Sequence, residues 1–355
     1  MHHELLQRFA LQLVSTFART LGARVLCGSA RVLCGGARVL CGGALALCFA
    51  AAAMAQDAFP SKPVRLFIFG AAGGPLDILA RAYADTLTPK WGQPIIIDAK
   101  PGAGGIIVAD YVAKQPGDGY TLLMTLPLTH ANNPILFVKL PYDPVRDFEP
   151  VTQLGTGGPV LIAPANAPYN TLKEFIAWAK ARPRVTYGSW GIGSGAHLFG
   201  ETLKRNAGLP LDHVPYKNEA PMHLDMLGGQ LDMGWANPGT ARRLAAGSKI
   251  KILAIAGVSR IGVLPDVPTF ADAGLKGFDL DAWVGIYASR GTPKAIVEKI
   301  SADFREAMKS PDLRTRMLDM GFEPLGNTPE EFAANYARDY PKWVEVIRSA
   351  GVTAQ

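Results

Sequence analysis

Glycine-rich segments separate strand patterns from helix patterns along this chain, and this alternation limits the possible folds more than any other feature. An apolar run over 64–69 ends in Gly70-Ala-Ala-Gly-Gly74 and leads into a helix pattern over 75–90. A strand pattern over 185–188 is followed by Gly191-Ile-Gly-Ser-Gly195 and a helix pattern over 196–206. Strands that alternate with helices are typical of α/β proteins with largely parallel sheets. We therefore expect an α/β fold.

The remaining elements continue the alternation, and the 355 residues allow two domains. Strands are expected at 95–97, 120–124, 159–163, 213–216, 231–235, 250–256 and 280–288. A helix is expected after the glycine-rich segment 101–105, ending at about residue 114. Further helices are expected over 172–181, 294–308, 312–320 and 330–349. Ligands of such proteins bind outside the carboxyl ends of strands. That rule selects the loops 70–77, 125–130 and 188–197.

Residues 1–55 have the pattern of a secretory signal peptide. Arginines precede an apolar stretch over 45–53, and Ala53-Met54-Ala55 fits the small-x-small cleavage rule. The stretch 39–55 contains a glycine pair and is shorter than the roughly 20 residues that a membrane anchor needs. A seven-residue repeat covers part of the leader, but its paired aliphatic residues do not form a coiled-coil seam. We expect cleavage after Ala55 and export to the periplasm.

Residues 56–355 lack the features of nucleic-acid, metal and nucleotide binding. All four cysteines lie in the leader, which also holds five of the 36 basic and one of the 30 acidic residues, so the remainder has a net charge of +2. This balance leaves no strongly basic face for nucleic acid. His130, His197, His213 and His223 occur in no His-x-x-x-His spacing, and the glycine loops match neither a P-loop nor a dinucleotide motif. We expect no metal and no cofactor.

The three selected loops supply the candidate binding residues. Glycines let the backbone approach a ligand, and a helix that starts after such a loop offers free N–H groups to an anion. Asp77 either caps its own helix or contacts the ligand, and Ser194 has the same two interpretations. The full set is Gly73, Gly74, Pro75, Leu76, Asp77, Thr125, Leu126, Thr129, Ser189, Trp190, Gly193, Ser194, His197, Trp235 and Asn237.

Several of these residues have a structural interpretation as well as a functional one. A secreted hydrolase would need a Gly-x-Ser-x-Gly elbow, and neither Ser189 nor Ser194 has glycines at the required positions. His197 fits a packed, hydrogen-bonded histidine better than a general base. Each tryptophan either belongs to a core or walls a pocket.

A series of short motifs follows in a fixed order over residues 57–355. They include Lys62-Pro-Val-Arg65, Lys100-Pro-Gly-Ala-Gly-Gly105, Asp118-Gly-Tyr-Thr-Leu-Leu123, His213-Val-Pro-Tyr-Lys217, Gly228-Gly-Gln230 and Leu264-Pro-Asp-Val-Pro-Thr269. This succession resembles the Bug family, the periplasmic solute receptors of tripartite tricarboxylate transporters.

The resemblance implies a type II periplasmic-binding-protein fold with a ligand cleft between two lobes. Lobe 1 would comprise 57–158 plus 283–355, and lobe 2 would comprise 159–282. Such a receptor binds a small carboxylate through backbone amides and water, delivers it to membrane permease subunits, catalyses no reaction and acts as a monomer. A receptor that presents its ligand to a membrane sensor is the alternative, and a secreted hydrolase is the weaker one.

The chain departs from the family pattern in the binding loops. Pro75 and Leu76 replace a Ser-Thr pair, and Trp235-Ala236-Asn237 replaces Phe-Asp-Asn. Small hydroxyl residues are also reduced in Thr125-Leu-Pro-Leu128 and Gly193-Ser-Gly-Ala196. We expect an apolar pocket for an aromatic or aliphatic monocarboxylate or a related amide, covered by Leu76, Leu126, Trp190 and Trp235. Alternatively, these side chains turn away and the backbone binds a dicarboxylate.

Overall fold

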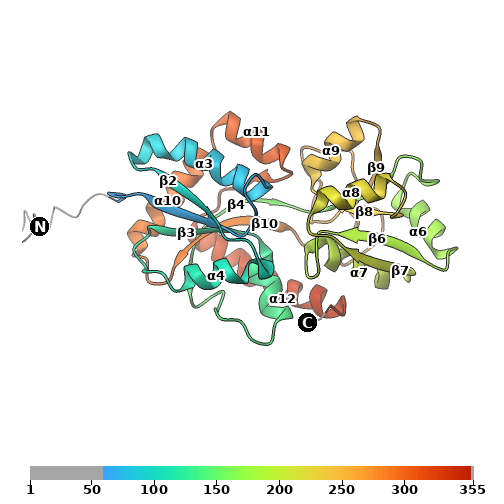
Figure 1. Cartoon of the computed structure of the whole chain (residues 1–355), viewed down its shortest axis with the longest axis horizontal. Helices are drawn as coiled ribbons and strands as arrows, with labels where there is room; N and C mark the ends of the chain where they lie inside the picture. The colour runs from blue at the N-terminus through green and yellow to red at the C-terminus, as the bar shows by residue number, and fades with distance from the viewer. Residues whose placement is uncertain (1–58, 353–355) are drawn as a thin grey trace, which may run out of the picture. The chain divides into compact units, whose positions relative to one another are not determined.

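The computed structural model describes residues 59–352, which form two lobes with separate β-sheets (Figure 1). The expected signal peptide, its cleavage site after Ala55 and the four cysteines lie outside the described residues. Within the described part of the chain, no helix combines the length and the apolar character that crossing a membrane requires.

Lobe 1 contains a six-stranded sheet with helices on both faces. Its strand order is β11-β4-β10-β3-β1-β2. Helices α3, α10 and α11 pack on one face, and α4 and the start of α12 pack on the other. The strands are β1 (Val64–Ile68), β2 (Ile95–Ala99), β3 (Thr121–Thr125), β4 (Phe148–Gly157), β10 (Ala282–Ser289) and β11 (Glu323–Pro324). The helices are α3 (Pro75–Trp91), α4 (Ile106–Ala113), α10 (Lys294–Ala307), α11 (Pro311–Asp319) and α12 (Pro329–Ser349).

Short helical turns follow two of these strands in lobe 1. The segment after β2 contains η1 (Ala103–Gly105), and the segment after β3 contains η2 (Leu128–Asn132) and α5 (Asn133–Leu136). The two segments meet where the side-chain amide of Asn133 donates to the carbonyl of Gly104 at 2.9 Å.

Lobe 2 contains a β6–β7 pair and a three-stranded sheet in the order β8-β5-β9. A parallel bridge between Tyr187 and Met233 connects β6 to the segment before β8. The strands are β5 (Val160–Pro164), β6 (Val185–Ser189), β7 (Leu211–Pro215), β8 (Gly234–Ala236) and β9 (Ile250–Ile255). The helices are α6 (Leu172–Lys180), α7 (Gly195–Ala207), α8 (Glu219–Leu227) and α9 (Pro238–Ala246).

The sheets are mixed, so the expectation of largely parallel sheets is wrong. Only β1–β2, β1–β3 and β6–β7 pair in parallel among the named strands of the described chain. Strand β10 lies antiparallel between β3 and β4, and β5 is antiparallel to both β8 and β9. The chain passes from β4 in lobe 1 directly into β5 in lobe 2 and returns after β9 into β10, without the helical crossover that would make neighbouring strands parallel.

Helix α12 contributes to the cores of both lobes. Near its start, Phe332 is buried against Trp283 and Tyr287 of lobe 1. Near its end, Trp343 and Ile347 belong to the main buried cluster of lobe 2. The lobe boundaries expected from the sequence stay a prediction, and the end of the 283–355 segment is shared between the lobes.

We expect Trp343→Ala to lower the free energy of unfolding by about 3–5 kcal/mol, because it leaves a cavity in the lobe 2 core. Denaturant unfolding followed by fluorescence and circular dichroism measures this loss. Glu345→Ala changes an exposed residue of the same helix and should stay within about 0.5 kcal/mol of the parent. Equal midpoints for the two variants would contradict the packing described for α12.

Candidate functional site

The carboxyl ends of parallel strands form one edge in each lobe. In lobe 1, the shared register of β1, β2 and β3 brings the loops that begin near residues 69, 100 and 126 to the same edge. In lobe 2, β6, β7 and the start of β8 run in parallel and lead into α7, α8 and α9. The predicted loops 70–77, 125–130 and 188–197 therefore lie at these edges.

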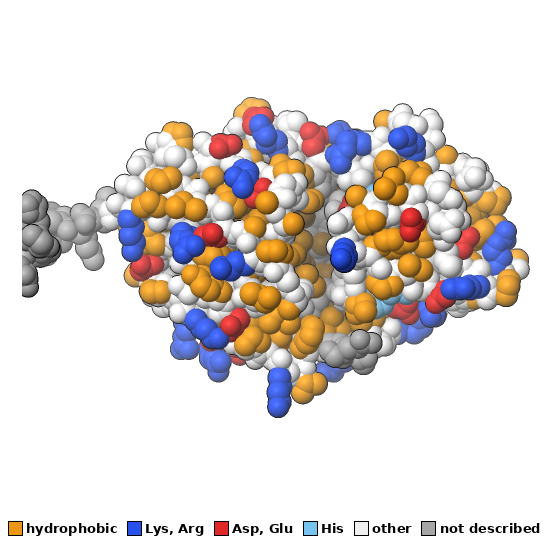
Figure 2. Space-filling view, viewed as in Figure 1, with side chains coloured by type: hydrophobic (Ala, Val, Ile, Leu, Met, Phe, Trp, Pro, Cys, Tyr) orange, Lys and Arg blue, Asp and Glu red, His pale blue; other side chains and the backbone are white. Residues whose placement is uncertain are grey.

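The two lobes contact each other at more than one point. The side-chain amide of Asn132 in lobe 1 donates to the carbonyl of Gly193 in lobe 2 at 3.0 Å. Elsewhere, Arg242 of α9 forms an ion pair with Asp319 at the end of α11. The space-filling view shows a recess between the lobes (Figure 2). This interlobe groove is the candidate ligand site.

Asp77 holds the first loop of lobe 1 in place. Its Oδ2 accepts hydrogen bonds from the backbone N–H of Gly73 at 2.9 Å and from Arg81 at 2.8 Å, and both bonds hold the pKa of the carboxyl below its ordinary value. Gly73 takes φ +77°, a conformation that favours glycine. The N-cap of α3 is Gly74, which has no side chain to occupy the N–H groups of the first turn, and exposed Pro75 follows it. The carboxylate thus braces the loop, and the helix start stays open.

The hydroxyl groups after β3 bond to one another. Thr125 and Thr129 are fully buried, and their Oγ1 atoms are 2.6 Å apart. Thr129 Oγ1 also lies 2.8 Å from Nδ1 of His130, whose ring stacks on Tyr287. Burial lowers the pKa of His130 to about 3, so this histidine is neutral at physiological pH. The half-buried Leu126 is the predicted residue of this loop that is partly open to solvent.

The second lobe's loop is braced in the same way. The Ser194 hydroxyl donates to the carbonyl of Gly191 at 2.6 Å and accepts from the N–H of His197, so Ser194 is the N-cap of α7. The N–H of Gly193 donates to Nδ1 of His197 at 3.1 Å. The His197 ring stacks on His213 with centroids 3.9 Å apart. These bonds fix the loop and satisfy one first-turn N–H group of α7, that of His197.

Ser189 and His213 are as close together as a catalytic nucleophile and its general base, but the serine is not accessible and the pKa of the histidine is too low. Ser189 Oγ lies 2.7 Å from Nε2 of His213. The serine is fully buried, and burial together with the neighbouring His197 lowers the pKa of His213 to about 3. A general base needs a pKa close to the working pH. The pair is therefore a structural hydrogen bond.

The structure corrects the expected role of two apolar side chains. Leu76 is 6% exposed and packs in the lobe 1 core, and Trp235 is completely buried beside Phe199 and Phe270. Neither side chain is placed to cover a ligand, because each belongs to a lobe interior. Trp190 is half-buried and packs against both lobe 2 cores, so it keeps an accessible face.

Glu219 is a residue of this edge that the sequence interpretation missed. Its Oε1 accepts hydrogen bonds from the backbone N–H of Asn237 at 3.1 Å and from the Asn237 side-chain amide. Asn237 precedes α9, and Glu219 is the first residue of α8. An acidic residue that opens a helix after a parallel strand is a usable sequence signal, but its partner lies 18 residues away.

Other features of the described chain do not point to a second centre. Within residues 59–352, no cluster of three or more His, Cys, Asp or Glu residues is arranged to hold a metal ion. A cavity of about 270 Å³ lies where the segment before β10 meets α12, lined by residues that include Asp281, Arg338 and Lys342. None of the predicted ligand-binding residues lines it.

Comparison with known proteins gives consistent similarities. The profile of the receptors of the tripartite tricarboxylate transporter family matches residues 79–352. The chain is 33% identical to the periplasmic binding protein BugD, with a TM-score of 0.74, over 84% of this chain and 100% of that one. It is 32% identical to R. palustris Rpa4515 with adipate (TM-score 0.76, covering 83% and 99%). It is 33% identical to MatC from Rhodopseudomonas palustris with bound malate (TM-score 0.72, covering 81% and 100%). These likenesses confirm the expected fold class.

We expect His213→Asn to flatten the acid side of the stability profile. A neutral buried histidine has a folded-state pKa below its unfolded value near 6.5, so its stabilisation is present above that pH and is lost as the pH falls toward 3. Thermal unfolding between pH 4 and pH 8, normalised to each protein's value at pH 8, measures the difference. An identical pH dependence in the parent and the variant would contradict the neutral His213–Ser189 brace.

Proposed function

The chain belongs to the receptor family of the tripartite tricarboxylate transporters, and on this premise we propose that it captures a small carboxylate with an apolar body. The family consists of periplasmic solute-binding receptors, not enzymes. Its relatives with adipate and malate are bound to carboxylates. Export with cleavage after Ala55 and delivery of the ligand to membrane permease subunits are part of the proposal.

The arrangement of helix starts across the groove is the observation that carries this proposal. Helix α3 begins after Gly74 in lobe 1, and helix α7 begins after Ser194 in lobe 2. The first-turn N–H groups of a helix have no intrahelical acceptor and favour an anion, helped by the helix dipole. The Arg81 guanidinium is occupied by Asp77, so backbone amides are the main groups that these loops offer to a carboxylate.

Internal hydrogen bonds support an apolar ligand body. Thr125 and Thr129 bond to each other, Ser189 bonds to His213, and Ser194 bonds within its own loop. A second polar group on the ligand would find these hydroxyls already paired, and burying it unpaired would cost free energy. Leu126 and Trp190, which are half-buried, and Pro75, which is exposed, remain as the accessible apolar residues of the predicted set. An aromatic or aliphatic monocarboxylate, or a related amide, suits this composition.

Thermal unfolding of residues 56–355 with a panel of acids tests the ligand class. Benzoate, nicotinate and hexanoate should raise the unfolding temperature more than citrate, succinate and malate do. A ligand at about 100 times its dissociation constant adds roughly 2.7 kcal/mol to the free energy of unfolding, which gives a clear shift. Tight binding of citrate or succinate without binding of the apolar acids would overturn the apolar pocket and keep the receptor.

Substitution of Gly195 tests the position of the ligand. Gly195 is the first residue of α7, a Cβ there would meet nothing within 4 Å, and its φ is outside the range reserved for glycine. Gly195→Leu should leave the unfolding temperature without ligand nearly unchanged and weaken binding of the best acid of the panel by more than about tenfold, because the side chain enters space near the helix start. Calorimetric titration measures the affinity.

Ala177→Leu is the matched control, since it adds the same side chain to an exposed position of α6 in lobe 2. It should bind the acid as the parent does. Equal affinities for Gly195→Leu and the parent would mean that the ligand does not approach the start of α7.

A further inference from the structure

A carboxyl group stands at the lobe 2 wall of the groove, and the proposed function gives it no role. Glu219 opens α8, and its Oε1 accepts both hydrogen bonds that Asn237 donates. Asn237 occupies the N-cap position of α9, but its side chain makes no capping hydrogen bond, and its amide nitrogen donates to Glu219. One carboxyl group therefore joins the starts of two helices.

Contacts with lobe 1 place Glu219 beside the groove. Strands β6, β7 and the start of β8 share a direction, so Glu219 and Asn237 lie at the same edge as Ser189 and the loop that leads to α7. The first turn of α9 touches lobe 1 so closely that a Cβ on Gly239 would come within 1.5 Å of the Asp319 carbonyl oxygen. A residue bonded to the cap of α9 is thus next to the interlobe contact.

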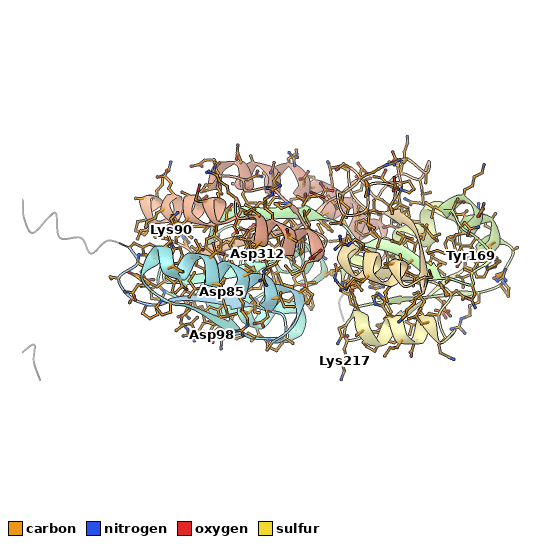
Figure 3. All side chains as sticks on the ribbon, turned by 90° about the horizontal axis from the view of Figure 1, so that it is seen from above. Asp85, Lys90, Asp98, Tyr169, Lys217 and Asp312 are labelled. Atoms are coloured by element: carbon orange, nitrogen blue, oxygen red, sulfur yellow. The ribbon has the colours of Figure 1, made fainter. Side chains whose placement is uncertain are left out.

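The surroundings of Glu219 leave its charge only partly balanced. The charged side chain facing it is Arg243 of α9, and Asn237 donates hydrogen bonds to it. Lys217, two residues earlier, is exposed and points away from the fold (Figure 3). Burial raises the pKa of Glu219 to about 7 in spite of these partners, so the carboxyl changes its charge near neutral pH.

We propose that Glu219 determines ligand specificity by rejecting a second carboxylate at the lobe 2 wall and favouring an uncharged hydrogen-bond donor there. This inference rests on the proposed function, in which one carboxylate of the ligand is held at the starts of α3 and α7. A second carboxylate near Glu219 would meet a like charge in a partly buried site. An amide or hydroxyl group at the same place could donate to the Glu219 carboxylate.

Matched ligand pairs test this role. Adipate and its monoamide, succinate and succinamate, and terephthalate and its monoamide differ only in whether the second end is a carboxylate. Calorimetric titration at pH 8 should show that the parent prefers the monoamide of the pair that binds. Glu219→Gln keeps the acceptor for Asn237 and should shift the ratio of affinities toward the diacid by about tenfold, the size of one moderate like-charge interaction.

Asp225→Asn is the control, because it removes one negative charge from the same helix at a residue that bonds to Tyr216 and not to α9. Its ratio of affinities should equal that of the parent. An unchanged ratio in Glu219→Gln, with binding retained, would overturn the role of Glu219 alone. No binding of any pair by a parent that binds an acid of the panel would also overturn the role of Glu219, because the favoured monoamide is then not accepted. No binding of the pairs or of any acid of the panel would overturn the proposed carboxylate site, and the role of Glu219 with it.

The pH dependence gives an independent readout. The parent's preference for the monoamide should grow between pH 6 and pH 8, as Glu219 ionises. Burial lowers the pKa of the nearby His223 on α8, which disfavours its charged form. Glu219→Gln should show a flat ratio over the same range. A ratio in the parent that does not change with pH would contradict the proposal.

Discussion

Hydrogen bonds between the binding loops and their own side chains determine what the groove can offer a ligand. Asp77 bonds to the N–H of Gly73, Ser194 bonds to the carbonyl of Gly191, and Gly193 bonds to His197. Most buried polar groups in proteins are paired, and these loops pair many of theirs internally, although Asp77 Oδ1, His130 Nε2 and Asn132 Oδ1 have no hydrogen-bond partner. These bonds hold the loops in place, and the first-turn amides of α3 and α7 remain for a ligand, except at Pro75, which has no N–H, and His197, which is capped by Ser194.

Because of this internal pairing, the groove differs from a binding site that is lined by free charged side chains. Arg81 is used by Asp77, and His213 is used by Ser189 and kept neutral by burial. A carboxylate can still bind, because helix starts attract anions without a formal positive charge. A ligand with several charged groups would have few further partners, and one of them would be Glu219, which has the same sign as the ligand.

The sequence predicted the elements well because apolar runs and glycine turns are local signals. Helix α3 and strands β1 and β6 lie close to their predicted bounds, and β8 is shorter than the predicted strand over 231–235. The mixed sheet could not be predicted, since the antiparallel position of β10 depends on how the chain returns from lobe 2. The local sequence pattern also could not predict that Trp235 is buried and Trp190 is partly exposed. Trp190 follows a strand and Trp235 lies in one, and burial of each indole depends on the packing of the whole lobe. Glu219 was missed for a related reason: its partner is distant in sequence.

The same long-range packing sets the limits on relative motion of the lobes. The crossing segments lie so close together that a Cβ on Gly158 would come within 1.7 Å of the Ala256 carbonyl oxygen. Helix α12 spans the lobes as well, with Phe332 in one core and Trp343 in the other. Pro341 lies inside α12 between these anchors. A proline has no N–H to donate, so bending the helix at that point breaks no hydrogen bond from residue 341. A hinge motion that opens the groove can therefore keep both cores intact if α12 bends near Pro341 while the crossing segments act as the pivot.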